Sequence, residues 1–434
     1  MVFTADAANA GIEAHLPILS EVNYFIHANP ELAYEEVKAH DKFVEVLTGL
    51  GFKVTPHAYG VPTSFLAEYG SGGRLVVYNA EYDALPGVGH ACGHNLIATA
   101  GFSAFLGAVA ALKAAGPGTQ GRVQLLGTPA EEGGGGKVKL IRAGAYKGVD
   151  ACLMVHPAPS AASLAAAASA AVSKDGDSGG MGEALAKAAA AGVREVAMVR
   201  MLASVKYSIF FEGKEAHAAM SPWAGVNALD AVCLSYNGIS MLRQQIRPYE
   251  RIHGIFREAG TRPNVTPAKT AVDYYVRSDT LAHAEALWGR VKACFEGAAL
   301  ATGCKVTYKP MDTYADLRSS PGLCRAYMEA MPKGTVIYST PSDFMAGSTD
   351  MGNVCYECPG FHGAFGIDAP PGAGNHTHGF TGAAGTDDAF QRAVNCGRGM
   401  AITGLKVLED DAFAASIREA WEADMKAAKA EGEN

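Results

Sequence analysis

The sequence predicts an α/β protein whose mostly parallel sheet is flanked by helices and interrupted by a smaller α+β domain. The first observation is a set of three short apolar runs, at 75–78, 123–126 and 151–155, separated by segments of helix-like composition. Strands buried on both faces have this pattern, because helices cover both faces of a parallel sheet. The second observation is an alternation of strand and helix patterns over 202–314. A chain of 434 residues is long enough for two such cores.

The main domain begins with helical apolar spacing over 14–50, which predicts a helix that ends at Gly51. The alanine-rich segment 102–115 predicts a crossover helix between the first two buried strands. Over about 160–200 alanine dominates, broken by a polar, glycine-rich stretch at 174–182. We interpret this segment as an insertion of two helices around a loop, with no assigned chemistry. The first part of the main domain is thus 1–201.

The second domain covers 202–314. Residues 205–211 alternate as a strand with one exposed face, and Ser221 followed by Pro222 predicts the start of a helix. Further patterns predict a strand at 269–277, a helix at 283–302 and a strand at 305–309. This order suits a small α+β domain with one open sheet edge. The chain then returns to the main domain over 315–434, ending in a charged amphipathic helix from about 410.

Composition excludes several classes of protein. A net charge of −8 argues against a nucleic-acid surface, and the absence of an uninterrupted run of about eighteen apolar residues argues against a membrane span. The first fourteen residues contain Asp6 and Glu13 and lack the pattern of a secretory signal. Nine cysteines are too sparse, and odd in number, for a disulfide framework, so we expect reduced thiols and a cytoplasmic location. The lone C-x-x-C of Cys355 and Cys358 is interpreted as structural.

Chemically unusual residues collect in the loops after the three apolar runs. They are Asp83, Cys92 and His94 after the first, Glu131 and Glu132 before four glycines after the second, and His156 at the end of the third. In open parallel sheets, ligands bind at the carboxyl ends of the strands. A thiol, imidazoles and carboxylates delivered to one sheet edge are the donors that a metal site requires. The sequence therefore predicts a metal centre there.

Each of these elements alone has an ordinary explanation. A His-Pro pair is usually a capped turn, and adjacent glutamates are usually solvated surface. A papain-like cysteine nucleophile is a competing interpretation, which we disfavour because such a pair needs residues that meet from distant segments, whereas Cys92 and His94 lie two apart on one loop. The combination of donors from three loops favours the metal centre.

The run 79–86 (NAEYDALP) followed by 89–95 (GHACGHN) resembles the MH-clan metallopeptidases and amidohydrolases, which include aminoacylases, auxin-conjugate hydrolases and p-aminobenzoyl-glutamate hydrolase. Further motifs agree in order along nearly the whole chain, at 27–32, 128–132, 213–219, 263–265, 347–354 and 376–380. The subgroup that contains the dipeptidase active on β-alanyl-lysine and related dipeptides looks most similar. The resemblance implies metal-dependent hydrolysis of an amide bond in small N-acyl amino acids or dipeptides.

The resemblance also implies roles for individual residues. The five metal ligands of two divalent ions match Cys92, His94, Glu132, His156 and His376. Zinc or manganese is the expected metal, with nickel and cobalt as alternatives, since imidazole and carboxylate accept all of them. Glu131 matches the general base, and His217 matches the group that stabilises the oxyanion, in relatives by reaching across a dimer. Asn264 and Arg277 match positions that bind the substrate's backbone or carboxylate; for Arg277, a surface ion pair is the alternative.

Two departures and one alternative function remain. Asn95 stands where much of the auxin-conjugate branch has aspartate, and His378 offers a second imidazole beside His376, although the spacing to Phe380 favours His376. The alternative function is a catalytically inactive metal-binding or scaffold homologue, which would be expected to have lost ligands that this sequence retains. The open sheet edge and His217 together predict a homodimer acting on a small-molecule substrate.

Overall fold

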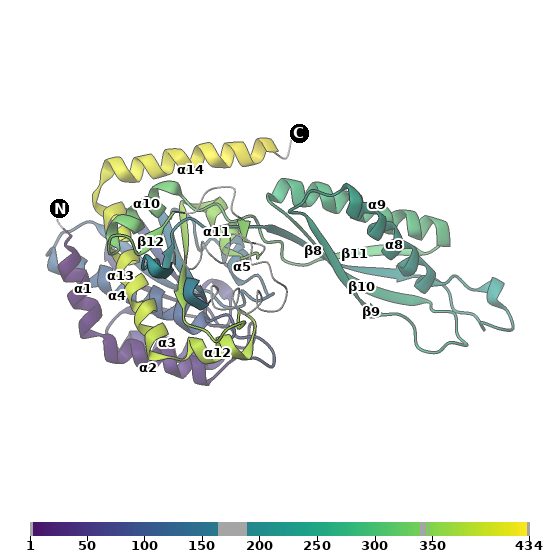
Figure 1. The fold of residues 1–434 in the computed structure, drawn as a ribbon, viewed down its shortest axis with the longest axis horizontal. Coiled ribbons are helices and arrows are strands. Elements are labelled where there is room, and N and C mark those ends of the chain that lie inside the picture. Colours follow the sequence, from purple (N-terminus) through teal and green to yellow (C-terminus); the bar gives the residue numbers. More distant parts are fainter. Residues whose placement is uncertain (1–2, 164–188, 339–343, 346, 432–434) are drawn as a thin grey trace. The chain divides into compact units, whose positions relative to one another are not determined.

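The computed structural model describes residues 3–163, 189–338, 344–345 and 347–431 (Figure 1). The chain divides into two compact units. The large unit consists of Met1–Arg200, Arg318–Asp343 and Asn353–Asp424, and the small unit of Met201–Leu317, Phe344–Gly352 and Met425–Asn434. The predicted fold class, an α/β domain with a mostly parallel sheet and a second α+β domain, is confirmed.

The large unit is built on an eight-stranded sheet of order β1-β2-β4-β3-β5-β14-β6-β12. Its strands are β1 (Lys53–Pro56), β2 (Phe65–Ser71), β3 (Leu75–Ala80), β4 (Gly121–Gly127), β5 (Ala151–Pro159), β6 (Glu195–Val196), β12 (Val336–Ile337) and β14 (Gly360–Ile367). The central strands β4, β3, β5 and β14 run parallel to one another. All three strands predicted from the apolar runs are therefore present, and β14 extends them by one.

Helices flank this sheet (Figure 1). They are α1 (Ala5–Ala14), α2 (Leu16–Ala28), α3 (Val37–Gly49), α4 (His94–Ala114), α5 (Gly136–Arg142), α10 (Pro321–Ala330), α11 (Met351–Glu357), α12 (His378–Ala384) and α13 (Asp387–Glu409), with a 3₁₀ turn at Ala58–Gly60. A further helix, α14 (Asp411–Glu431), follows α13 in the chain. The predicted crossover helix is α4, which packs against α1, α13 and the sheet. Within the described part of the chain, α4 is the one helix long and apolar enough to span a membrane, yet 94% of its apolar window is buried, as in a core helix.

The single helix predicted over 14–50 is wrong, because the chain breaks between α2 and α3. Proline disfavours helical backbone in the residue before it, and Asn29, which precedes Pro30, has φ −124° and ψ 67°. The predicted stop is correct, since Gly51 follows α3 with φ +81°, a conformation that glycine adopts without strain. The predicted C-terminal helix is α14.

The segment 160–200 lies partly outside the described residues, since 164–188 are not described. Its last part contains a short strand of the large sheet, which was not predicted. Glu195 and Val196 form β6, which pairs antiparallel with Phe365 and Ala364 of β14 and parallel with β12. A two-residue strand leaves no periodic signal in the sequence, so composition alone could not separate it from the alanine-rich stretch.

The small unit has a four-stranded antiparallel sheet of order β11-β8-β10-β9. Its strands are β8 (Ala203–Glu212), β9 (Arg251–Glu258), β10 (Lys269–Ser278) and β11 (Lys305–Pro310), and its helices are α8 (Ala228–Leu242) and α9 (Leu281–Thr302). The two helices pack against each other and on the sheet, where Trp288 of α9 stacks on Tyr207 of β8 with ring centroids 4.2 Å apart. Two 3₁₀ turns, Pro222–Ala224 and Arg243–Gln245, flank α8, and β7 (Arg200–Met201) pairs with β13 (Phe344–Met345).

The predicted helix start at Ser221 is wrong. Pro222 begins only a 3₁₀ turn, and α8 is capped six residues later by Asn227, whose side chain accepts a hydrogen bond from the Leu229 amide at 3.0 Å. Asparagine is as good a cap as serine, so the residue type alone does not favour Ser221 over Asn227 as the start of the helix. Strand β9 was not predicted, because most of its residues are exposed and it lacks an apolar alternation.

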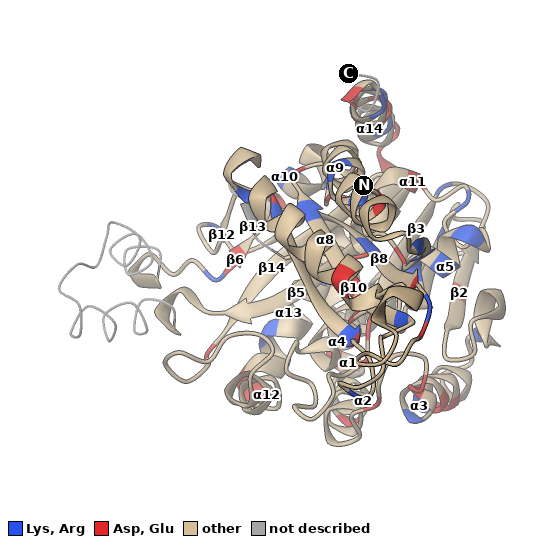
Figure 2. Cartoon of the chain, turned by 90° about the vertical axis from the view of Figure 1, so that its right-hand side faces the viewer, with Lys and Arg blue, Asp and Glu red and all other residues tan. Residues whose placement is uncertain are grey.

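Charged residues of both signs are interspersed on the outer helices (Figure 2). On α3, for example, Lys38, Asp41, Lys42 and Glu45 alternate in sign, and α14 is mixed in the same way. Neither helix therefore presents a face of a single charge sign.

Candidate metal centre

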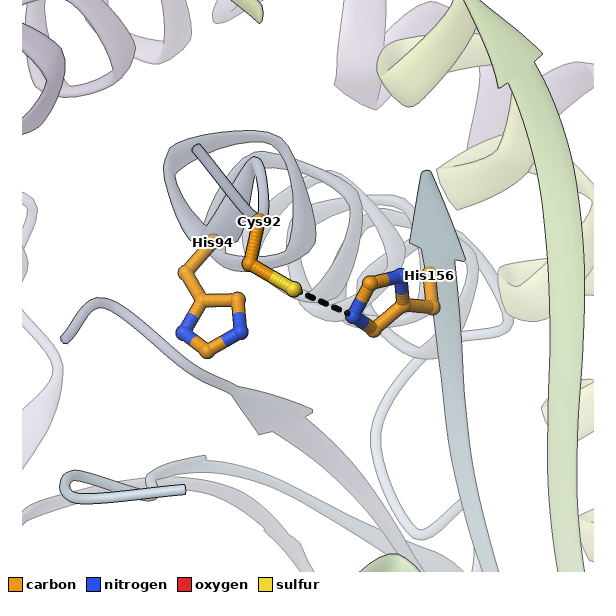
Figure 3. A group of neighbouring side chains, drawn as sticks. All are labelled: Cys92, His94 and His156. Atoms are coloured by element: carbon orange, nitrogen blue, oxygen red, sulfur yellow. Dashed lines mark hydrogen bonds between the residues drawn. The ribbon is translucent and has the colours of Figure 1, made fainter. Parts of the chain in front are cut away.

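Donor side chains from four parallel strands meet at the carboxyl edge of the large sheet. Cys92 and His94 follow β3, with His94 opening α4; Glu132 follows β4; His156 lies near the end of β5; and His376 follows β14. Figure 3 shows Cys92, His94 and His156 directed into one space from a loop, a helix start and a strand. Three overlapping groups have donor atoms within 4.8 Å of one another: Cys92, His94 and His156; Cys92, Glu132 and His376; and His94, Glu131 and Glu132.

The carboxylate of Asp83 fixes the orientation of the His94 ring. Its Nδ1 lies 2.9 Å from Oδ1 of Asp83, and both side chains are fully buried. The other carboxylate oxygen of Asp83 accepts the amide of Glu132 at 2.9 Å. Burial lowers the pKa of His94, but the adjacent Asp83 carboxylate outweighs it and holds that pKa well above its ordinary value. Conversely, burial raises the pKa of Asp83, and the His94 ring more than offsets this and keeps it low. A carboxylate that fixes a ligating imidazole in this way is common in metal sites.

The centre contains polar atoms that nothing in the described part of the chain satisfies. Nε2 of His94, Oε2 of Glu81 and Oε1 of Glu132 are buried without a hydrogen-bond partner. Nε2 of His94 lies 3.6 Å from Oε2 of Glu81 and 3.8 Å from Oε1 of Glu132. Two donors about 2.1 Å from one ion, at a tetrahedral angle, are about 3.4 Å apart. These separations, too long for hydrogen bonds, therefore fit a divalent cation between the donors.

Cys92 faces the imidazole of His156. Its Sγ lies 3.3 Å from Nε2 of His156, and Nδ1 of the same ring donates to the carbonyl of Pro157 at 2.8 Å. Burial, followed by repulsion from His94, lowers the pKa of His156, so this ring is neutral and presents a lone pair to the sulfur. His362 of β14 stacks behind it, with ring centroids 6.0 Å apart.

This contact changes the case against a papain-like nucleophile. Cys92 does meet a histidine from a distant segment, so the reason given from the sequence, that its partner would be His94 on the same loop, was wrong. Burial instead provides the contrary evidence, because it raises the pKa of the Cys92 thiol well above its ordinary value. A cysteine nucleophile needs a lowered pKa.

Glu131 lies on a strained turn after β4. The preceding residue, Ala130, has φ +62°, a left-handed conformation unusual for a residue with a side chain. The amide of Ala130 donates to Oε1 of the buried Glu36 at 2.8 Å, which holds this turn in place. Gly136 closes the turn: a Cβ there would lie 1.7 Å from the carbonyl of Pro129. The four glycines thus permit a tight loop that presents both glutamates, and Glu131 is only 7% exposed.

His376, not His378, is directed at the centre. Its Nε2 lies 3.3 Å from Oε1 of Glu132, whereas His378 is the first residue of α12. His376 also has a left-handed backbone, with φ +68°, and its amide donates to the carbonyl of Ala91 at 2.8 Å. Attraction to the Glu132 carboxylate, whose Oε1 lies 3.3 Å away, raises the pKa of His376 despite partial burial. The loop after β14 is therefore tied to the loop that carries Cys92.

Asn95 has a structural task. Its side-chain amide donates to Oδ1 of Asn23 at 2.9 Å and to the carbonyl of Ala384 at 3.0 Å. It therefore ties the start of α4 to α2 and α12. An aspartate at this position would place a carboxylate against two hydrogen-bond acceptors. The asparagine, which donates to both, therefore suits these surroundings better than the aspartate of the auxin-conjugate branch.

The predicted residues of the small unit lie on two adjoining segments. His217 forms an antiparallel bridge with Val265, and the amide of Ala218 donates to the carbonyl of Asn264 at 3.1 Å. Nδ1 of His217 accepts the amides of Ala219 and Met220, at 3.3 and 3.1 Å, which leaves the proton on Nε2. His217 is exposed.

Beside these segments lies a cavity of about 410 Å³, lined in part by Ala218, Arg262 and Val265. Arg277, on β10, donates to the hydroxyl of Ser348 at 3.0 Å and is half-buried. Its guanidinium therefore contacts the 347–354 motif rather than forming only the surface ion pair considered from the sequence.

Sequence reasoning missed three buried charged residues around the centre. Glu36 anchors the turn before Glu131, and Glu81 pairs with Lys137. Glu81 lies in the loop after the first apolar run and could have been included on that ground. Glu36 and Lys137 carry no local signal, because a lone charged residue is normally solvent-exposed.

The profile of peptidase family M20/M25/M40 matches residues 77–396. The chain belongs to this family. Among the relatives of this M20/M25/M40 peptidase, the Xaa-Arg dipeptidase of Mus musculus is 36% identical over 423 residues, covering 94% of this chain and 90% of its own. A p-aminobenzoyl-glutamate hydrolase chain of Escherichia coli is 32% identical, covering 69% of this chain and 58% of its own. The chain is thus a hydrolase of the amidohydrolase and dipeptidase group.

Solved structures share its fold. A crystal structure from Bacillus subtilis, described as a dinuclear metal-binding peptidase of the M20 family, superposes with a TM-score of 0.61 at 19% identity, covering 92% of this chain and 99% of its own. The aminobenzoyl-glutamate utilization protein of Klebsiella pneumoniae gives 0.65 at 17% identity, covering 93% and 99%. At these identities the likeness extends to the fold alone.

Proposed function

We propose that this M20/M25/M40 peptidase hydrolyses the amide bond of dipeptides or N-acyl amino acids at a centre of two divalent ions. The observation that carries the proposal is the overlap of the three donor groups, in which Cys92, His94 and Glu132 each belong to two. Shared donors of this kind suit two neighbouring ions better than one. Zinc or manganese is the proposed metal, because the centre combines a soft thiolate with imidazoles and carboxylates.

Cys92, His94, Glu132, His156 and His376 would hold the ions, and Asp83 would orient His94. When bound, divalent ions lower the pKa of water and polarise a carbonyl. Glu131, partly shielded on its strained turn, is proposed to take the proton of the attacking water and to return it to the leaving amine. A carboxylate beside that water can do both, since the proton taken in the first step is the one required in the second.

His217 is proposed to stabilise the tetrahedral oxyanion. Its tautomer supports this role: because Nδ1 accepts two backbone amides, Nε2 carries the proton that an oxyanion needs. Asn264, on the adjoining segment, and Arg277, whose fork is already fixed at one end by Ser348, are proposed to bind the substrate's backbone and carboxylate. We further propose a homodimer and a cytoplasmic location, the latter because all nine cysteines are free thiols.

Dipeptides are the favoured substrate class, with a basic C-terminal residue first among them. The support is the similarity to an Xaa-Arg dipeptidase over 94% of the chain. N-acyl amino acids are the second class, supported by the shorter match, over 31% of the chain, to the N-acetyl-L-cysteine deacetylase of Bacillus subtilis at 33% identity. An inactive scaffold is disfavoured, because the complete donor set is assembled.

The test is a substrate panel with the full chain, loaded with Zn²⁺ or Mn²⁺. Dipeptides ending in Arg, Lys, Leu or Glu would be compared with the matching N-acetyl amino acids by release of the free amine. Higher kcat/KM for dipeptides ending in Arg or Lys supports the proposed substrate class. Preference for N-acetyl amino acids would overturn that class, and no turnover of either set, with two ions bound, would overturn the proposed reaction.

A further inference from the structure

A buried ion pair adjoins the proposed metal centre without being part of it. Glu81 follows β3 directly, and Lys137 lies in the first turn of α5; both side chains are fully buried. The ammonium of Lys137 donates to Oε1 of Glu81. Removing two charges from water is costly, so a pair in this position needs further favourable interactions. Because one oxygen is fixed by Lys137, the orientation of the whole Glu81 carboxylate is fixed.

The second oxygen of Glu81 is turned towards His94. Oε2 is buried, has no hydrogen-bond partner among the described residues, and lies 3.6 Å from Nε2 of His94. That nitrogen is itself unsatisfied, because Asp83 occupies the other side of the ring. Leaving a buried polar atom unsatisfied is destabilising, and here two such atoms face each other across a gap that suits an ion.

Resting on the proposed function, we infer that Glu81 is a further ligand of the metal centre, contributing Oε2 to the ion held by His94, and that Lys137 positions it. Glu81 thereby differs from Asp83, two residues further on, whose oxygens are both occupied by His94 and the Glu132 amide. One loop supplies a ligand and the residue that orients another ligand. The buried charge of Lys137 also offsets part of the negative charge that Glu81, Asp83 and Glu132 bring together.

The experiment measures metal binding by Glu81→Gln. Dissociation constants for Zn²⁺ are obtained by competition with a chromogenic chelator, and the Co²⁺-substituted protein is examined by visible absorption, which reports coordination number. Loss of a residue that only orients a ligand weakens binding by about 10–100-fold. We expect Glu81→Gln to weaken one of the two sites by more than that, with a changed Co²⁺ spectrum. A loss below about 100-fold together with a wild-type Co²⁺ spectrum would overturn the inference.

A second variant guards against a folding defect. Glu81→Leu combined with Lys137→Met replaces the pair by apolar side chains of similar volume, a change that is often neutral for stability. The same loss of metal affinity is expected there. Glu195→Gln is the matched control, because it also replaces a buried glutamate of the large sheet, on β6, by its amide, and should bind metal as the wild type does.

Different results would contradict the proposed role of Glu81 and the proposed function of the protein. If the wild-type chain binds no divalent ion, the proposed function is overturned. If the wild type binds two ions and both Glu81 variants bind them equally well, with identical Co²⁺ spectra, only the role of Glu81 is overturned.

Discussion

Oδ1 of Asp83 lies 2.9 Å from Nδ1 of His94, on the side of the imidazole opposite to its unsatisfied Nε2. The carboxylate therefore sets both the direction of the ring and the nitrogen that carries the proton. The second oxygen of Asp83 accepts the amide of Glu132, so one side chain orients donors from two loops.

Asp83→Asn should weaken divalent-metal binding by about 10–100-fold, because an amide has one acceptor oxygen for two donors and lacks the charge that supports His94. Chelator competition with Zn²⁺ would measure the dissociation constant. Asp368→Asn is the matched control, since Asp368 pairs with Arg392 at the exposed end of β14. Equal affinities in the two variants would contradict the role of Asp83.

Glu131→Gln should keep the full metal content and lower kcat by about 10²–10⁴-fold, the usual contribution of a general base. The amide retains the shape of the side chain but cannot accept the proton of water. Elemental analysis would establish metal content, and steady-state kinetics on the best substrate of the panel would give kcat. A fully active variant would show that another group takes the proton.

The proposed action of His217 across a dimer can be tested by mixing two inactive variants, His217→Ala and Glu131→Gln. If His217 reaches the partner's centre, each hybrid dimer has one intact site and one site with both defects. Random mixing makes half of the dimers hybrids, so about a quarter of wild-type activity should return.

The control for this experiment is each variant subunit mixed with itself through the same dissociation and reassociation. Light scattering would verify the dimer beforehand. Absence of recovery in verified hybrids would mean that His217 acts within its own chain, and a fully active monomer would contradict the dimer itself.

Asn95→Asp should lower the free energy of unfolding by about 1–3 kcal/mol, because the carboxylate cannot donate to Asn23 and Ala384 and remains buried. Urea denaturation would measure the change. Asn395→Asp, on the exposed surface of α13, is the matched control and should be nearly neutral. An unchanged free energy of unfolding in the Asn95 variant would show that these two hydrogen bonds make no net contribution to stability.

Glu195→Gln should stabilise the protein at high pH only. Burial raises the pKa of Glu195 in the folded chain to about 7. In the unfolded chain the pKa of a glutamate is about 4.3. The folded chain therefore retains a proton that the unfolded chain loses, and wild-type stability falls as the pH rises from about 4.3 to 7. Gln keeps the hydrogen bond from Tyr327 without this loss.

At pH 8 the Glu195 variant should therefore be more stable than the wild type, by about 4 kcal/mol at most, and at pH 4 the two should be nearly equal. Urea denaturation at both pH values would measure the difference. A difference of the same size at pH 4 and pH 8 would show that Glu195 is not protonated in the folded wild type.

Much of the centre could be predicted because parallel strands bring their carboxyl ends to one edge. That rule alone placed Cys92, His94, Glu132 and His156 together, and the structure shows the same arrangement. His376 required the resemblance, since the strand before it, β14, has the glycine-rich sequence GFHGAFGI and does not stand out as an apolar run.

Other features depend on tertiary contacts that leave no local pattern. The pairing of Glu81 with Lys137 arises only because the turn after Glu132 returns α5 to the end of β3. Pro30 indicates the end of α2 at the sequence level. The prediction of one helix over 14–50 gave more weight to the helical spacing of the apolar residues on both sides of this proline. The two-residue strands β6 and β12 are defined by their neighbours in the sheet and not by their own composition.

The pairing of β14 with β5 also determines when the centre can form during synthesis. Residues 152–159 find their parallel partner at 360–367, on the far side of the small unit's sequence. A nascent chain that has emerged only as far as the small unit holds Cys92, His94, Glu132 and His156, but β5 has an unpaired edge. His376 arrives later still. The donor set is therefore complete only after the chain has left the ribosome as far as His376.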